Sequence, residues 1–206
     1  MIRFGSVSRF FQLETRSGVR ILRLASADGT NRLSRACVLS LTEAIGALAA
    51  NPGPLILAGN LKFFSVGADL NEIAALTGPS AYEFAKMGQR LMRLIADFPA
   101  PVCAAVEGHC MGGGLDLALA CHRRIASAHA VFGHRGAALG LITGWGGTQR
   151  LPRLIGKARA LELLVAAEKF PAAAALRIGL VDLIAPDPAA EAARRLGTEA
   201  SLPDWR

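Results

Sequence analysis

The sequence predicts an α/β domain, because short apolar runs alternate along the chain with longer segments of helical periodicity. The runs at residues 55–58 and 102–106 have the length of buried strands. Two strand-to-helix junctions, at residues 59–70 and 108–121, carry glycine at the bend. These observations favour strands that feed directly into helices, and therefore an α/β fold.

Local signals then define the elements in order. Residues 19–24 alternate as a strand does, and Ser34 is suited to cap a helix that runs to about residue 50. Ser80 and Glu83 fit the capping box of a later helix. The other expected elements are strands at 55–58, 102–106, 124–126 and 131–132, a short helix capped by Asp69, a helix over 149–167, a helix that starts at Pro171, a turn and strand over 179–184, and a helix from residue 188.

Three consecutive glycines at residues 112–114 mark the second junction. The first N–H groups of a helix have no internal acceptor, and glycine lets a ligand oxygen approach them closely. Asp116 lies three residues after Gly113, so its carboxylate shares the face above the same turn. This combination suits chemistry that forms an oxyanion while moving a proton, although a glycine hinge with Asp116 near the helix dipole explains the segment equally well.

Composition limits the classes of function. With 206 residues, 52% of them hydrophobic and 19% charged, the chain is expected to be one folded domain and is not a disordered protein. The net charge of +7 suits an anionic ligand, whereas one Tyr and two Trp are too few aromatics for a nucleic-acid surface. No apolar run reaches the length of a membrane span, and no secretory signal is visible. Four cysteines without a Cys-x-x-Cys pair are typical of reduced thiols, so we expect a cytoplasmic protein without membrane partners.

Four segments together resemble the crotonase superfamily of enoyl-CoA hydratases and isomerases. They are FFSVGADL at residues 63–70, the glycine stretch at 108–121, FGHRGAALGLITGWGGTQRL at 132–151 and GLVD at 179–182. The resemblance implies a crotonase-like spiral of ββα units with a shortened C-terminal helical region, because the chain stops soon after GLVD. We therefore expect a single acyl-CoA-binding domain over residues 1–206, with a core at about 19–184 and a short helical tail at 188–206.

The resemblance also implies the site. On the matching positions, the N–H groups of Ala68 and Gly113 form the oxyanion hole for a thioester carbonyl. The strand edge around Lys62, Val66, Ala68 and Leu70 contacts coenzyme A. Coenzyme A is then part of the substrate, so no separate cofactor is expected. The histidines show no metal-binding spacing, so no metal is expected either.

Two positions depart from the family pattern of paired glutamates. The first glutamate position holds Asp116, which is shorter by one methylene, and the second holds Gly136, which has no side chain. His134 lies two residues from that gap, either as an auxiliary titratable group or as a residue that fixes the turn. Asp116 is then the single acid/base candidate, and isomerisation is easier to support than hydration.

Two alternatives stay open at this point. A catalytically weak acyl-CoA-binding or assembly subunit keeps the fold without full activity. A crotonase-type thioester hydrolase or decarboxylase needs the oxyanion hole without both glutamates. The resemblance and the apolar composition also predict a homo-oligomer, either a trimer or a dimer of trimers, whose neighbouring subunit covers the acyl end of the site if that end is not open to water.

Overall fold

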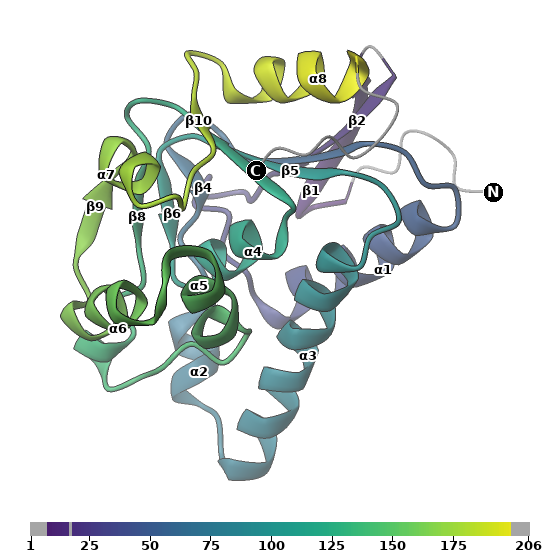
Figure 1. The fold of residues 1–206 in the computed structure, drawn as a ribbon. Helices are drawn as coiled ribbons and strands as arrows, with labels where there is room; N and C mark the ends of the chain where they lie inside the picture. The colour runs from purple at the N-terminus through teal and green to yellow at the C-terminus, as the bar shows by residue number, and fades with distance from the viewer. Residues whose placement is uncertain (1–7, 17, 199–206) are drawn as a thin grey trace.

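The computed structural model describes residues 8–16 and 18–198 as two β-sheets flanked by helices (Figure 1). The larger sheet has the strand order β1-β2-β3-β5-β7-β10, and the smaller sheet has the order β4-β6-β8-β9. From β2 to β10 the larger sheet is parallel, while β1 is antiparallel to β2. The strands are β1 (Phe11–Arg16), β2 (Val19–Leu24), β3 (Leu55–Ala58), β4 (Phe63–Ser65), β5 (Val102–Val106), β6 (His109–Met111), β7 (Arg123–Ala126), β8 (Val131–Gly133), β9 (Lys169–Pro171) and β10 (Leu183–Ile184).

The chain repeats a strand of the larger sheet, a strand of the smaller sheet and then a helix. The pairs β3–β4, β5–β6 and β7–β8 each follow this order, which confirms the expected α/β spiral of ββα units. The helices are α1 (Arg35–Ala49), α2 (Leu70–Ala74), α3 (Gly78–Ala96), α4 (Gly113–Ala120), the 3₁₀ turn η1 (Ala137–Leu139), α5 (Gly147–Ile155), α6 (Lys157–Ala166), α7 (Ala172–Arg177) and α8 (Pro188–Thr198).

Both faces of the larger sheet are covered. Successive side chains of a strand point to opposite faces, so Leu55 and Leu57 of β3 join one apolar cluster with α1, α3 and α4. Ile56 and Ala58 join a second cluster with α8, which lies across the sheet (Figure 1). Burial on both faces explains why these strands read as continuous apolar runs in the sequence.

The predicted caps of α1 and α2 are confirmed. The side chain of Ser34 accepts a hydrogen bond from the Cys37 N–H at 3.3 Å. The carboxylate of Asp69 accepts from the N–H groups of Asn71 at 2.8 Å and Glu72 at 3.4 Å. Each cap satisfies N–H groups that have no acceptor inside the helix.

Other boundaries differ from the prediction. The capping residue of α3 is Thr77, whose N–H donates to Ser80 Oγ at 2.8 Å, so the helix starts before Ser80. The helix expected over 149–167 is two helices, because Gly156 has a φ of 86° and breaks it. Pro171 ends β9 and caps α7 instead of lying inside the helix. Strands β1, β4, β6 and β9 were not predicted as strands. Of the tail helix expected over 188–206, only α8 lies within the described residues.

Candidate active site

The two glycine junctions lie against each other. Gly67 precedes Ala68 after β4, and Gly112 precedes Gly113 after β6, with φ values of +93° and +52°. A Cβ atom added to Gly67 would lie 2.8 Å from the Gly113 nitrogen, and one added to Gly113 would lie 3.3 Å from the Ala68 nitrogen. Only residues without a side chain allow the two turns to approach this closely.

The N–H groups of Ala68 and Gly113 are free to bind a ligand. Neither donates a hydrogen bond to another described residue. Gly113 is the first residue of α4, so its N–H has no acceptor within the helix. Both residues border one cavity of about 600 Å³. The two turns therefore present two adjacent donors to the same space, as an oxyanion hole requires.

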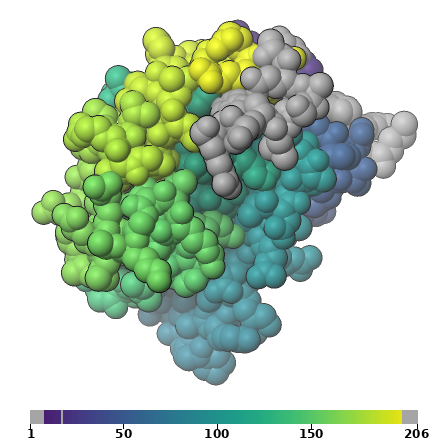
Figure 2. All heavy atoms as spheres, viewed as in Figure 1, coloured from purple at the N-terminus to yellow at the C-terminus, as the bar shows by residue number. Residues whose placement is uncertain are grey.

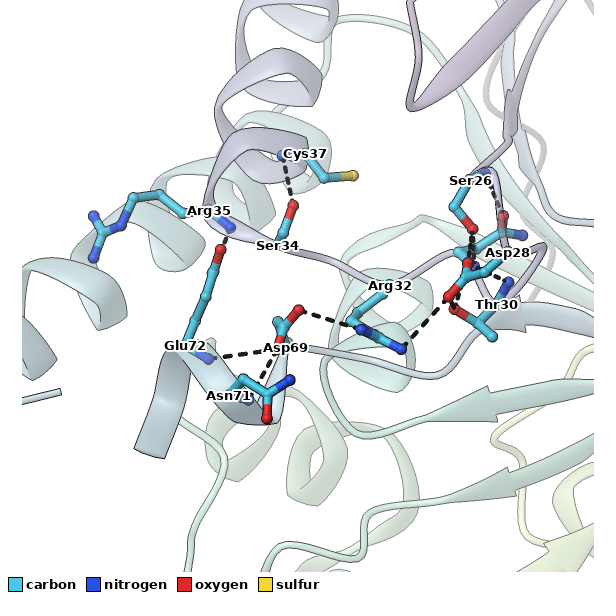
Figure 3. Close-up of polar contacts among 11 residues, drawn as sticks. Ser26, Asp28, Thr30, Arg32, Ser34, Arg35, Cys37, Asp69, Asn71 and Glu72 are labelled. Atoms are coloured by element: carbon cyan, nitrogen blue, oxygen red, sulfur yellow. Dashed lines mark hydrogen bonds and ion pairs between the residues drawn. The ribbon is translucent and has the colours of Figure 1, made fainter. Parts of the chain in front are cut away.

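A polar network braces the Ala68 turn from the loop between β2 and α1 (Figure 3). The Leu33 N–H donates to the Gly67 carbonyl at 2.9 Å. The Arg35 N–H donates to Glu72 Oε2 at 2.7 Å, and Arg32 lies 3.4 Å from a carboxylate oxygen of Asp69 (Figure 3). The loop and the start of α2 are thereby held together on either side of Ala68.

The carboxylate of Asp28 accepts hydrogen bonds from its neighbours in the same loop. Hydrogen bonds from the hydroxyl of Ser26 and from the backbone and hydroxyl of Thr30 lower the pKa of Asp28 to about 2 (Figure 3). Asp28 therefore stays ionised at neutral pH, and Arg32 lies 3.5 Å from its other oxygen. The loop that supports Ala68 is thus preorganised by its own hydrogen bonds.

Asp116 is buried beside the donors, with 2% of its surface exposed. Its Oδ2 atom accepts a hydrogen bond from the Thr143 hydroxyl at 2.6 Å and lies 3.8 Å from His134 Nε2. A Cβ atom added to Gly147 would clash with the Oδ1 atom of Asp116. This oxygen has no hydrogen-bond partner among the described residues. A carboxylate held in this way, with one oxygen unengaged, is suited to accept or deliver a proton.

Gly136 and His134 lie opposite Asp116 on the loop after β8. Gly136 has a φ of −56°, a value open to every residue type. A Cβ atom at Gly136 would lie 2.9 Å from the Leu141 carbonyl oxygen and 3.4 Å from His134 Cε1. The side chain of His134 is only 11% exposed. It is one of the residues that line the cavity.

The structure brings nearly all of the predicted site residues to one cavity. Ala68, Gly113, Asp116, His134 and Gly136 line it, as do Val66, which follows β4, and Leu70, which begins α2 instead of lying on a strand edge. Lys62 does not: it is exposed immediately before β4 and is not among the residues that line the cavity. The apolar side of the cavity is formed by Leu70, Ile73, Leu76, Phe84, Leu141 and Ile142.

Sequence analysis missed Thr143 and Trp145. Thr143 is the donor to Asp116, and Trp145 packs its ring against Gly113, where an added Cβ would lie 2.7 Å from the ring. The indole N–H of Trp145 donates to the Phe84 carbonyl at 3.3 Å. Both residues lie more than 25 positions from the groups they support, and no local pattern in the sequence links them.

Other chemistries find little support in the part of the chain that the structure describes. That part contains no cluster of three His, Cys, Asp or Glu residues able to hold a metal. The four cysteines are buried and unpaired, and burial raises the pKa of the Cys37 thiol to about 12, so this thiol is a poor nucleophile. None of the described helices is both long enough and apolar enough to cross a bilayer.

The sequence matches the family model for enoyl-CoA hydratase/isomerase over residues 14–199. The chain belongs to this family. It is 39% identical to a crotonyl-CoA hydratase of Syntrophomonas wolfei over 84% of its own length and 67% of that protein. It is 46% identical to a probable enoyl-CoA hydratase of Bacillus subtilis over 66% of its own length and 53% of that protein. The chain thus spans about half to two thirds of the length of these relatives.

Solved structures of enoyl-CoA hydratases show the same fold. The protein from Bacillus anthracis superposes with a TM-score of 0.86 at 34% identity, covering 92% of this chain and 77% of that one. The protein from Thermoplasma volcanium gives a TM-score of 0.88 at 29% identity, covering 95% of this chain and 79% of that one. The spiral of ββα units is therefore the crotonase fold.

Proposed function

We propose that the protein is an enzyme of the enoyl-CoA hydratase/isomerase type, which stabilises the enolate of an acyl-CoA thioester. The observation that carries this proposal is the pair of unengaged N–H groups, of Ala68 and Gly113, on the same cavity as the buried carboxylate of Asp116. Donors aimed at a developing oxyanion and a nearby acid/base group are the two requirements of enolate chemistry.

The proposed mechanism uses backbone donors for charge and one carboxylate for the proton. The thioester oxygen accepts hydrogen bonds from Ala68 and Gly113, and losing one such donor typically costs about 3–4 kcal/mol of transition-state stabilisation. Asp116 takes a proton from C2 of a 3-enoyl thioester, the C–H electrons move into a dienolate whose oxygen is held by the two N–H groups, and Asp116 returns the proton to C4 to give the 2-enoyl thioester. This step is an isomerisation and needs no second acid/base group.

The cavity fits the two ends of an acyl-CoA. Its apolar wall, which includes Ile73, Leu76 and Phe84, suits an acyl chain. Val66, Ala68 and Leu70 form the edge along which we place the pantetheine, and the exposed Lys62 lies beyond that edge for the anionic nucleotide. Coenzyme A enters as part of the substrate, so the proposal needs no separate cofactor or metal.

A panel of acyl-CoA thioesters tests the proposal, with turnover and calorimetric binding measured separately. Interconversion or hydration of 2-enoyl- and 3-enoyl-CoA that is lost in Asp116→Asn supports the enzyme. Binding without turnover selects the weak binder or assembly subunit. Release of free coenzyme A thiol, or of carbon dioxide from a malonyl-type thioester, selects hydrolysis or decarboxylation. Absence of binding by every thioester contradicts the proposal.

We also propose that the protein assembles as a homo-oligomer, either a trimer or a dimer of trimers. Helix α6, which lies on the face shown in Figure 2, exposes 64% of Leu161 and 66% of Val165. These residues are four apart and so adjacent on the helix, and contiguous exposed apolar surface favours an interface. Sedimentation of the protein at micromolar concentration tests this, and a monomer contradicts it.

We further propose a cytoplasmic location. Its support is the set of four free, buried cysteines, which is typical of proteins kept in a reducing compartment. Fractionation of cells that express the protein tests this proposal. Recovery from the membrane or an extracellular fraction contradicts it.

A further inference from the structure

Two buried polar atoms, on side chains that line the cavity, lack hydrogen-bond partners among the described residues. They are Asp116 Oδ1 and His134 Nε2, both fully buried and both without an acceptor or donor among the described residues. Leaving a buried polar atom unsatisfied destabilises the fold, so such atoms are rare unless a ligand or water engages them. Their side chains line the same cavity as the donors of Ala68 and Gly113.

Two neighbouring ββα units bring this pair together. Asp116 lies on α4 after β6, and His134 directly follows β8, which pairs in parallel with β6. The Thr143 hydroxyl fixes Asp116 Oδ2, and His134 Nε2 lies 3.8 Å from that same oxygen. This separation is too long for a direct hydrogen bond but short enough for a proton to pass after a small movement.

The imidazole also occupies the space next to the missing side chain. A Cβ atom at Gly136 would lie 3.4 Å from His134 Cε1, at van der Waals contact, so a longer side chain at position 136 would lie against the imidazole. Glycine at position 136 leaves this space open next to His134.

We propose that His134 is the second proton-transfer group of this site and that, paired with Asp116, it enables the addition of water to a 2-enoyl thioester. This inference rests on the proposed function. In this proposal Gly136 takes no part in the chemistry and only leaves space next to the imidazole of His134. A single carboxylate suffices for isomerisation, whereas the pair supplies both a base for water and an acid for carbon.

The step balances with water as the only co-reactant. The water oxygen bonds to C3 as Asp116 takes its proton, and the C2=C3 π electrons move into the thioester. The resulting enolate oxygen is held by the N–H groups of Ala68 and Gly113, and C2 takes the proton of the His134 imidazolium. Asp116 then passes its proton to His134, which restores both groups.

The charged groups around His134 set the expected pH dependence. Asp116, Arg135 and Lys169 border the same cavity. Arg150 interacts with Asp116: burial lowers the pKa of Arg150, and the negative charge of Asp116 opposes that shift. Because the step needs a protonated imidazole, the proposal requires the rate of hydration to fall as pH rises.

The test compares the wild type with His134→Gln, His134→Asn and the control His129→Gln. His129 also lies near a carboxylate, 3.7 Å from Glu107, but its side chain is 59% exposed. Hydration of a 2-enoyl-CoA is measured from pH 5 to 9, with binding of the saturated thioester measured by calorimetry and folding by thermal melting. The Gln and Asn variants keep a polar group without an ionisation in this range, and either suffices if the other fails to fold.

We expect both His134 variants to bind the thioester as the wild type does, to hydrate about 10²–10⁴-fold more slowly, and to lose the alkaline fall in rate. His129→Gln should keep the wild-type rate and profile. A folded His134 variant that hydrates at the wild-type rate, or keeps the alkaline limb, overturns the inference. So does a wild type that binds acyl-CoA but does not hydrate it. A wild type that binds no thioester instead overturns the proposed function.

Discussion

The cavity has two unlike walls. One wall is made by the junctions at Gly67 and Gly112, where an added carbon at Gly67 meets backbone atoms at 2.7 and 2.8 Å. The other wall is the loop from His134 to the start of α5, where an added carbon at Gly140 meets nothing within 4 Å and 70% of Ile142 is exposed. The first wall depends on close backbone packing, and the second depends on which side chains the loop carries.

This difference separates the oxyanion-hole positions from Gly136, one of the two positions that depart from the family pattern. Ala68 and Gly113 lie on the packed wall, whose geometry allows few replacements. Gly136 and His134 lie on the loop wall, where the side chains decide the chemistry. At Gly136 an added Cβ would lie 2.9 Å from the Leu141 carbonyl oxygen, so a replacement there also requires the loop to shift. We therefore expect substitutions on the packed wall to affect stability and activity together, and substitutions of loop side chains to affect activity with a smaller loss of stability.

The largest expected effect is on activity, at the carboxylate that both walls contact. Asp116→Asn keeps the size of the side chain and an acceptor for Thr143 but cannot take a proton. We expect kcat to fall about 10²–10⁴-fold while acyl-CoA binding changes little. Steady-state kinetics and calorimetry measure the two effects. Glu107→Gln, outside the cavity, is the control, and equal rates for Asp116→Asn and the wild type would contradict the assignment.

Gly67→Ala and Gly140→Ala compare the walls directly. Both glycines have positive φ, +93° and +68°, so both variants bear the strain of a side chain there. Only Gly67→Ala also forces a carbon against backbone atoms, which adds about 1–3 kcal/mol of destabilisation. We expect urea unfolding to show a clearly larger loss for Gly67→Ala, together with loss of thioester binding. Equal losses in the two variants would remove the distinction between the walls.

Thr143→Val measures how much the loop wall stabilises Asp116. The substitution keeps the shape of the side chain and removes the donor to Asp116 Oδ2, which leaves a buried carboxylate oxygen unsatisfied. We expect a combined cost of about 1–3 kcal/mol, seen as a lower melting temperature, a lower kcat or both. Thr148→Val is the control, because the Thr148 hydroxyl accepts a long hydrogen bond from Gln149 Nε2, at 3.5 Å, and has no hydrogen bond to the carboxylate of Asp116. A Thr143 variant that behaves like this control contradicts the proposed support.

The smallest expected effect is on stability and concerns His122, which is not among the residues that line the cavity. Its Nδ1 accepts a hydrogen bond from the Val102 N–H at 2.8 Å, and its Nε2 lies 3.1 Å from the Ala96 carbonyl oxygen. Because Nδ1 must be unprotonated to accept, the folded protein holds the imidazole in its neutral form. Burial lowers the pKa of His122. The unfolded chain therefore takes up the proton first as pH falls below about 6.5, and the free energy of unfolding declines from there downward.

Thermal melting between pH 7.5 and 5.5 measures this decline. We expect His122→Gln to lower the melting temperature at pH 7.5 but to flatten its dependence on pH. The carboxyl groups with lowered pKa, such as Asp28 and Glu191 at about 2, titrate at lower pH and do not obscure this range. An unchanged pH dependence in His122→Gln assigns the decline to another group.

The sequence by itself determined the caps of α1 and α2 and the two glycine junctions, whereas the spiral of repeating units was expected from the family resemblance. The caps and the junctions depend on residues within a few positions of one another, because helix capping and positive-φ turns are satisfied locally. The junction at residues 112–114 identifies Gly113 and Asp116, and the family resemblance adds Ala68. The break of the long C-terminal helix at Gly156 was missed because a helical glycine and a helix-ending glycine look alike until φ is known.

Only the tertiary structure decided which side chains meet around Asp116. Thr143 and His134 come from the loop of the next unit, 27 and 18 positions away, and Trp145 reaches back to Gly113 from the same loop. No periodicity in the sequence encodes these contacts. They arise because parallel pairing of β6 with β8 sets two units side by side, and packing then fixes which side chains share the buried space.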